Sequence, residues 1–203
     1  MIKINKSDFK QSSKLLGTAF SHDPLFNYLF GSHSKDRISQ FFHFVLAYNH
    51  IKKQLIIGKK EHGFLQGVAC IEKPQSPKMT QLVLTQIKVF ILIWQLAFQV
   101  KWSTFKKVND YMKILNNQRP AERHHYLVCI GVAHKEQGKG IGKNLLSFIH
   151  EIVDNDPLST GIALDTENAA NIAFYKSFGY HLIREQSLST ITVYTMFRSK
   201  KET

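Results

Sequence analysis

The stretch that decides the fold is Gln137-Gly138-Lys139-Gly140-Ile141-Gly142-Lys143, which separates an apolar run from a helical pattern. The apolar run covers residues 126–132 and predicts a strand, while the pattern after the glycines predicts a helix to about residue 152. Glycine permits positive φ and close approach of the backbone to a ligand, and the first amides of a helix have no partner inside it. A strand, a glycine turn and a helix start together predict a site for an anionic group.

Two familiar phosphate-binding loops do not fit the spacing of this stretch. The P-loop pattern requires Gly where Gln137 stands, and Ser or Thr where Asn144 stands. The dinucleotide fingerprint, counted from Gly138 and Gly140, requires a third glycine at the position of Lys143. What remains is the pattern Q-x-x-G-x-G, formed by Gln137, Gly140 and Gly142.

A second motif follows, Asn168-Ala169-Ala170-Asn171-Ile172-Ala173-Phe174-Tyr175-Lys176-Ser177-Phe178-Gly179-Tyr180. In their order and separation the two motifs resemble the acetyl-CoA and second signatures of the GCN5-related N-acetyltransferase (GNAT) family. The resemblance covers residues 126–197. The stretch 18–26 adds to it, because it is similar to the opening helix of the small-molecule acetyltransferases of this family.

The resemblance implies an acetyl-CoA site between two splayed strands. Residues 130–132 would lie beside the pantetheine and thioester, and the backbone amides of residues 138–143 would meet the diphosphate. Gly131 either marks the bulge that opens the strands or allows tight packing. The implied cofactor-binding residues are Ile130, Gly131, Val132, Gln137, Gly138, Lys139, Gly140, Ile141, Gly142, Lys143, Asn168, Asn171 and Tyr175.

Several of these side chains also have ordinary structural explanations. Lys139 and Lys143 can be solvated, because the family uses mainly main-chain donors at this turn. Asn168 can cap the following helix, and Asn171 can be a simple polar helix residue. For the two asparagines, contact with the pantetheine arm and these structural roles are equally open.

By resemblance, Tyr175 is the general acid that protonates the departing thiolate of coenzyme A. A phenol with a pKa near 10 stays protonated at neutral pH and suits this task. Direct attack by the amine is favoured over an acetyl-enzyme on Cys129, because that cysteine lies in an apolar run with no identifiable activating base or acid.

The general base is not decided by the sequence. Many relatives carry a glutamate on the strand before the glycine turn, but residues 125–132 contain none. The candidates are Glu122, His124 or His125 at the start of that strand and Asp165 at the end of the next one, acting directly or through water.

Composition restricts the class of protein. The chain has 203 residues, 43% of them hydrophobic, and a net charge of +12, which suits one domain with an excess of positive surface charge. Coenzyme A would use only part of that charge, and no specific nucleic-acid motif is present. The two cysteines form no disulfide framework, and the N-terminus lacks a secretory signal pattern, so we expect a cytoplasmic protein, as a monomer or homodimer.

Two further features have structural and functional interpretations. The apolar stretch 82–100 contains twelve residues between Lys88 and Lys101, too few for a membrane span, and predicts a buried helix or, alternatively, an interfacial one. His43 and His50 are seven residues apart on a predicted helix, but no acidic or cysteine partner completes a zinc site nearby. We therefore expect no metal.

The predicted fold class is mixed α/β, of the α+β type, with the acyl-CoA N-acyltransferase fold that the resemblance implies. It has a mostly antiparallel central sheet with one splayed parallel pair, flanked by helices. Residues 1–203 are expected to form a single GNAT-like domain with a helical insertion at about 79–118. Strands are expected at 2–4, 55–57, 64–72, 125–132, 161–165, 181–185 and 190–197, and helices at 8–20, 25–30, 36–52, 79–115, 141–152 and 169–177.

The resulting hypothesis is an acetyl-CoA-dependent N-acetyltransferase that acts on a primary amine of a small molecule by direct attack. A protein lysine or N-terminus is the alternative acceptor. A second class remains open: a non-catalytic acyl-CoA-binding sensor or scaffold whose basic surface contacts nucleic acid or a membrane.

Overall fold

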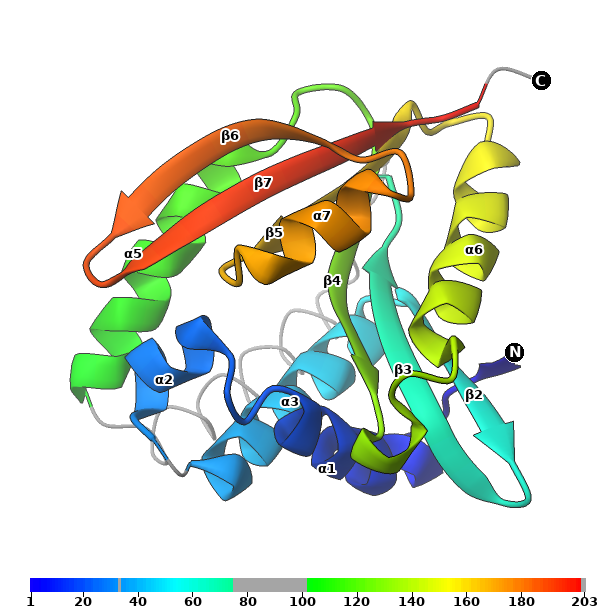
Figure 1. Ribbon diagram of the computed structural model, residues 1–203, viewed down its shortest axis with the longest axis horizontal. Helices are drawn as coiled ribbons and strands as arrows, with labels where there is room; N and C mark the ends of the chain where they lie inside the picture. Colours follow the sequence, from blue (N-terminus) through cyan, green and yellow to red (C-terminus); the bar gives the residue numbers. More distant parts are fainter. Residues whose placement is uncertain (33, 75–101, 202–203) are drawn as a thin grey trace.

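The computed structural model of the chain describes residues 1–32, 34–74 and 102–201. At its centre is a seven-stranded sheet with the order β1-β2-β3-β4-β5-β7-β6 (Figure 1). Neighbouring strands are antiparallel except for β4 and β5, which are parallel, so the predicted fold class is confirmed. The strands are β1 (Ile2–Lys3), β2 (Leu55–Glu61), β3 (Phe64–Glu72), β4 (His125–Val132), β5 (Gly161–Thr166), β6 (His181–Leu188) and β7 (Ile191–Ser199).

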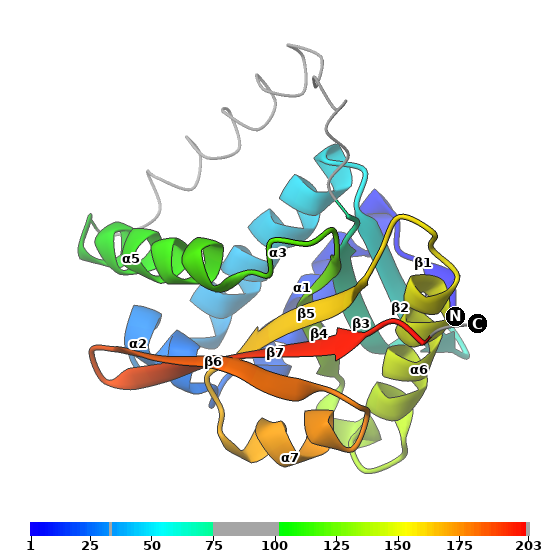
Figure 2. The same ribbon diagram turned by 90° about the horizontal axis from the view of Figure 1, so that it is seen from above.

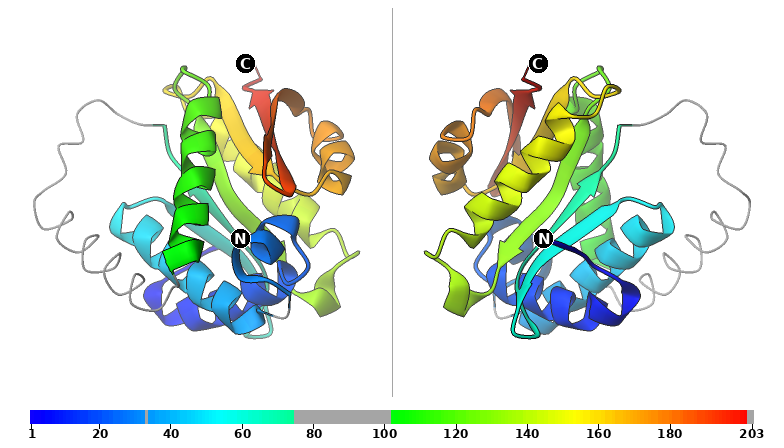
Figure 3. Two further views of the ribbon diagram at one scale, coloured as in Figure 1. Left: turned by 90° about the vertical axis from the view of Figure 1, so that its left-hand side faces the viewer. Right: turned by 90° about the vertical axis from the view of Figure 1, so that its right-hand side faces the viewer.

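Helices cover both faces of this sheet (Figures 2 and 3). On one face, α1 and α3 enclose a core that contains Leu16, Phe42 and Val68. On the other face, Leu145 and Ile149 of α6 pack with Tyr175 of α7 and with β4 and β5. The helices are η1 (Lys6–Asp8), α1 (Phe9–Ala19), α2 (Pro24–Phe30), α3 (Lys35–Ile51), α5 (Trp102–Gln118), η2 (His134–Glu136), α6 (Ile141–Asp154) and α7 (Ala170–Lys176).

Helix α5 belongs to the part of the chain for which the sequence offers no motif. Its residues Val108 and Tyr111 pack with Leu25 and Leu29 of α2, and Ile114 packs with β7. The helix predicted over residues 79–115 is thus described from Trp102 onward, and the apolar stretch 82–100 lies outside the described residues. Within the described ranges, no helix has the length and apolar character needed to cross a membrane.

The first hairpin is longer than its sequence pattern predicts. Strand β2 continues through Lys59, Lys60 and Glu61, and the turn is made by His62 and Gly63, both at positive φ. These three charged residues give no apolar pattern from which a strand could be predicted. Lys60 and Glu61 are exposed, because the hairpin extends beyond the core there.

The parallel pair β4 and β5 separates part-way along its length. Pairing joins His125 to Ile162, Tyr126 to Ala163 and Leu127 to Leu164, and ends there, although β4 continues to Val132. Beyond this point the two ribbons run in different directions (Figure 1).

A β-bulge lies at the point of separation. On the other side of β4, Cys70 of β3 pairs with Cys129 and Ile71 pairs with Leu127, which leaves Val128 as the extra residue. A bulge bends its strand and increases the local twist, so β4 turns away from β5 immediately after its last paired residue. The prediction that Gly131 marks the bulge was wrong: Gly131 pairs regularly with Val68. It is glycine because a Cβ there would lie 2.7 Å from Leu16 Cδ2 on α1.

Candidate active site

The glycine turn joins β4 to α6 through two residues in the left-handed region. Gly138 has φ of 79° and Gly140, the residue before the first turn of α6, has φ of 77°. A Cβ at either position would meet no atom within 4 Å, so backbone conformation and not crowding requires glycine here. The amide of Asn144 donates to Gly140 O at 2.9 Å. By helix geometry, the amides that precede it at the start of α6 have no partner within the helix and can receive an anion.

The side chains of the turn take structural roles around these amides. Gln137 Nε2 donates to Val132 O at 3.4 Å, across the turn, and Lys139 Nζ lies 3.2 Å from Glu136 Oε2. Lys143 is exposed on the first turn of α6. The start of α6 lies against the end of β4, since a Cβ at Gly142 would be 3.5 Å from Val132 Cγ2. The start of α6 after the glycine turn therefore lies beside the diverging end of β4.

The second motif places α7 beyond the end of β5. Asn168 Oδ1 accepts from the Ala170 amide at 3.1 Å, and Asn171 Nδ2 donates to Thr166 Oγ1 at 3.2 Å. Both asparagines thus stabilise the turn from β5 into α7, a structural role that their sequence pattern allowed.

Tyr175 of α7 is buried near Cys129 of β4 and Glu167 at the end of β5. Its side chain is 8% exposed, and its ring packs against Phe174 and Tyr180 at centroid distances of 5.4 and 5.6 Å. Burial raises the pKa of Tyr175 well above that of a free phenol, and so, to a smaller extent, do the nearby Cys129 and Glu167. Within the described residues its hydroxyl has no hydrogen-bond partner. Tyr175 is therefore a protonated phenol that can donate its proton.

Cys129 on β4 lies close enough to Tyr175 for the two groups to interact electrostatically. Its thiol is buried, and burial raises its pKa to about 12. Because the nucleophilic form of cysteine is the thiolate, this thiol is inert at neutral pH. The environment of Cys129 thus disfavours an acetyl-enzyme.

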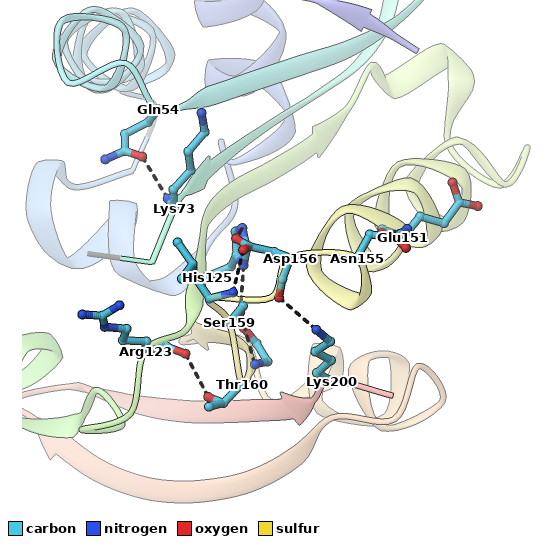
Figure 4. Close-up of polar contacts among 12 residues, drawn as sticks. Gln54, Lys73, Arg123, His125, Glu151, Asn155, Asp156, Ser159, Thr160 and Lys200 are labelled. Carbon is cyan, nitrogen blue, oxygen red and sulfur yellow. Dashed lines mark hydrogen bonds and ion pairs between the residues drawn. The ribbon is translucent and has the colours of Figure 1, made fainter. Parts of the chain in front are cut away.

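The candidate bases at the start of β4 lie at the closed end of the strand pair, where β4 and β5 are still hydrogen-bonded to each other. His125 is 2% exposed, with Nδ1 3.0 Å from Ser159 Oγ and Nε2 3.4 Å from Asp156 Oδ2 (Figure 4). Next to it, the Thr160 amide donates to Arg123 O at 2.8 Å, which ties the loop before β5 to the chain before β4. These contacts hold the two strands together before they diverge.

Glu122 and His124 belong to the same end of the strand. Glu122 is exposed, and its carbonyl oxygen is 2.7 Å from His124 Nδ1. The structure therefore does not bring Glu122, His124 or His125 together with the glycine turn, which follows the opposite end of β4.

Asp165 is nearer to the separated strands, but its carboxylate is already engaged. It hydrogen-bonds with the Tyr126 hydroxyl through one oxygen and with the Thr195 hydroxyl through the other. Burial raises its pKa, while these two hydrogen bonds oppose the rise. Asp165 thereby links β4, β5 and β7 just beyond the last β4–β5 pair.

Two acidic residues near Tyr175 were missed by the sequence reasoning. Glu167 follows β5 directly, and Asp23 precedes α2, where its Oδ1 accepts from the Leu25 amide at 3.0 Å. Burial raises the pKa of Asp23 to about 6 and that of Glu167 to about 8. The available signal was the position of Glu167 between a buried strand and the second motif. Asp23 lies in the stretch 18–26, whose resemblance to the opening helix of the small-molecule acetyltransferases assigned no role to its side chain.

Comparisons with known proteins agree with this geometry. Residues 103–180 match the family model described as Acetyltransferase (GNAT) family. An uncharacterised N-acetyltransferase of Schizosaccharomyces pombe is 25% identical over 197 residues, which cover 92% of this chain and 75% of the relative.

Solved structures show the same fold at low sequence identity. The structure of histone acetyltransferase HPA2 and related acetyltransferase from Corynebacterium glutamicum superimposes with a TM-score of 0.68 at 14% identity, over 100% of this chain and 96% of the other. The ribosomal-protein-S18-alanine N-acetyltransferase of Escherichia coli gives a TM-score of 0.58 at 13% identity, over 100% and 94%. The family match over residues 103–180, together with the two motifs, shows a GNAT acetyltransferase domain in this chain, and the solved structures show the fold of that family.

Proposed function

We propose that the protein transfers the acetyl group of acetyl-CoA to a primary amine of a small molecule by direct attack. The observation that carries this proposal is the separation of β4 and β5 after Leu127 and Leu164. The glycine turn follows the end of β4, and Tyr175 lies near Cys129 of β4. A strand edge without a partner can hydrogen-bond an extended ligand, and free amides at a helix start suit a diphosphate.

The residues present fit acetyl-CoA. The space around Gly138 and Gly140 is open, and the edge of β4 from residues 130 to 132 is free of β5. In this proposal residues 130–132 line the pantetheine arm, residues 137–143 bind the diphosphate, and Asn168 and Asn171 flank the arm from the α7 side. Acetyl-CoA supplies the thioester and the leaving thiol.

The chain's own residues would contribute orientation and proton transfer. The amide donors of β4 would stabilise the negative charge that develops on the thioester oxygen. Tyr175 would donate its proton to the departing sulfur. Because its pKa is raised, its hydroxyl is protonated at neutral pH. Holding amine and thioester together supplies much of the remaining rate.

The test is a thiol-release screen with acetyl-CoA and a panel of small amines, together with calorimetric binding of acetyl-CoA. Binding and release with at least one small amine is the expected result. No binding of acetyl-CoA would refute the proposal. Thiol release only with peptides that carry a free N-terminus or a lysine would show that the acceptor is a protein. The Escherichia coli structure is named for such an acceptor, a ribosomal protein.

Replacing Gly142 with alanine should separate binding from stability. The added methyl group would make ordinary contact with Val132 at 3.5 Å and improve helix propensity, so the melting temperature should stay constant or rise. The same methyl group would occupy the junction between the start of α6 and the end of β4. We expect the Kd of acetyl-CoA, measured by calorimetry, to increase about tenfold or more, which corresponds to roughly 1.4 kcal/mol. An unchanged Kd would place the coenzyme elsewhere.

A further inference from the structure

Two acidic side chains from separate parts of the chain lie near Tyr175. Glu167 lies between β5 and α7, Asp23 lies before α2, and both are close enough for their charges to raise the pKa of Tyr175. Tyr111 of α5 donates its hydroxyl proton to Glu167 Oε1 at 2.7 Å. Residues distant in sequence are thus brought to the open end of the strand pair.

Glu167 is an acidic side chain without a cationic partner. Among the described residues its only side-chain hydrogen bond comes from Tyr111, and no Lys, Arg or His lies within ion-pair distance. By contrast, the buried Arg198 is paired with Asp154 at 2.8 Å, and Arg119 is paired with Glu72 at 2.8 Å. Glu167 is half-buried, and an ionised carboxylate at such a position without a cationic partner costs stability.

We propose that Glu167 is the general base of the transfer, that Tyr111 positions its carboxylate, and that Asp23 and Glu167 together select acceptors that arrive as alkylammonium cations. This inference rests on the proposed acetyl transfer and specifies its acceptor. The ammonium group of the substrate would then be the cationic partner that Glu167 lacks within the protein.

The proton transfers balance with these groups. Glu167 takes one proton from the ammonium group, and the free nitrogen attacks the thioester carbon, forming the C–N bond. As the C–S bond breaks, Tyr175 gives its proton to the sulfur. The second proton of the nitrogen restores Tyr175, and Glu167 releases its proton to water, so the products are the amide, coenzyme A and one proton.

The electrostatic environment of Glu167 suits this exchange. Burial is the main cause that raises its pKa to about 8, and the charges of Asp23 and Asp165 add to the rise, whereas the Tyr111 hydrogen bond lowers it. A carboxyl group with such a pKa is closer in proton affinity to an alkylamine than an ordinary carboxyl group is, so the free-energy cost of the proton transfer is lower. The neighbouring tyrosines Tyr111, Tyr126 and Tyr175 stay protonated over the same range, because burial raises the pKa of each.

The pH dependence follows from the direction of this shift. Below pH 8 the free enzyme holds a proton on Glu167, and above it the carboxylate is ionised. The kcat/KM for butylamine, cadaverine or spermidine should therefore rise as the pH increases through about 8, since this ratio reports the groups of the free enzyme.

The main variant is Glu167→Gln, which keeps the shape of the side chain and removes the proton acceptor. With these three amines we expect kcat to fall about 100- to 1,000-fold and the rise near pH 8 to disappear, while the Kd of acetyl-CoA stays unchanged. The pKa of Glu167 is higher in the folded than in the unfolded protein, so its ionised form destabilises the fold at pH 9. Glu167→Gln removes this charge, and we expect its melting temperature at pH 9 to rise. Such a rise would also show that the variant folds. The exposed Glu185→Gln on β6 is the matched control and should leave kcat unchanged.

Two further variants test the neighbours of Glu167. Tyr111→Phe removes a hydrogen bond that lowers the pKa of Glu167, so the rise of kcat/KM should move to higher pH. Asp23→Asn keeps the helix cap but removes a charge, so it should raise the KM of the cationic amines about tenfold with a smaller change in kcat.

Each result distinguishes this inference from the proposed function. If acetyl-CoA does not bind, the acetyl-transfer proposal fails. If acetyl-CoA binds and none of the three amines releases thiol, selection of alkylammonium acceptors is refuted, whatever else is acetylated. If the amines react and Glu167→Gln retains the wild-type kcat and pH profile, the base assignment is refuted.

Discussion

Tyr175→Phe is expected to lower kcat about 100- to 1,000-fold without weakening the binding of acetyl-CoA. The hydroxyl of Tyr175 has no hydrogen-bond partner among the described residues, and its ring packs against Phe174 and Tyr180. Phenylalanine preserves that packing and removes only the proton that a departing thiolate needs, and general acid catalysis contributes about 10²–10⁴-fold. The measurement is steady-state thiol release with the best amine, beside calorimetric binding of acetyl-CoA.

The matched control is Tyr180→Phe. Tyr180 lies next to Tyr175, but its hydroxyl is 3.1 Å from His150 Nε2 on α6 and so has a structural partner. We expect this variant to lose about 1 kcal/mol of stability and to keep kcat within a few-fold. If Tyr175→Phe retained full turnover, the acid would have to be another group, although acetyl transfer itself would stand.

Gly161→Ala is expected to destabilise the fold severely. Gly161 begins β5 and pairs with Ser199 of β7. A Cβ at this position would lie 2.2 Å from Arg198 O and 2.6 Å from Phe197 Cζ. The oxygen belongs to the backbone of the neighbouring strand, so the overlap can be relieved only by separating β5 from β7. We expect a loss of at least about 3 kcal/mol in the free energy of unfolding, from overpacking combined with broken pairing.

Urea denaturation followed by circular dichroism would measure this loss. Gly142→Ala is the control, because its added methyl group makes only ordinary contact and its φ is not positive. A loss below about 1 kcal/mol for Gly161→Ala would contradict the close approach of β5 and β7.

The glycine turn and the second motif were predictable because their chemistry is local. Gly138 and Gly140 are required by the φ angles of their own residues, and the helix that follows starts in the same short stretch. The position of Tyr175 on α7 follows from the spacing within its own motif. Such features depend little on the rest of the chain, so the sequence pattern is sufficient to identify them.

The bulge was less predictable, because it depends on pairing between distant strands. Gly131 had the residue type that often accompanies a bulge, but the extra residue in β4 is Val128. The glycine is needed where α1 approaches the strand. A strand sequence does not specify which of its residues lacks a partner when the partner is about sixty residues away.

The sequence by itself determined the class of fold and predicted the acyl donor, through two short motifs whose backbone conformations are set by neighbouring residues. Only the tertiary structure decided which acids lie near Tyr175. It placed His125 at the closed end of the strand pair, and it placed Asp165 in hydrogen bonds with the hydroxyl groups of Tyr126 and Thr195. The proton affinity of Glu167 is raised by burial and by the charge of Asp23, and it is moderated by Tyr111. Burial of this kind arises from the packing of helices and strands distant in the chain, and no local pattern encodes it.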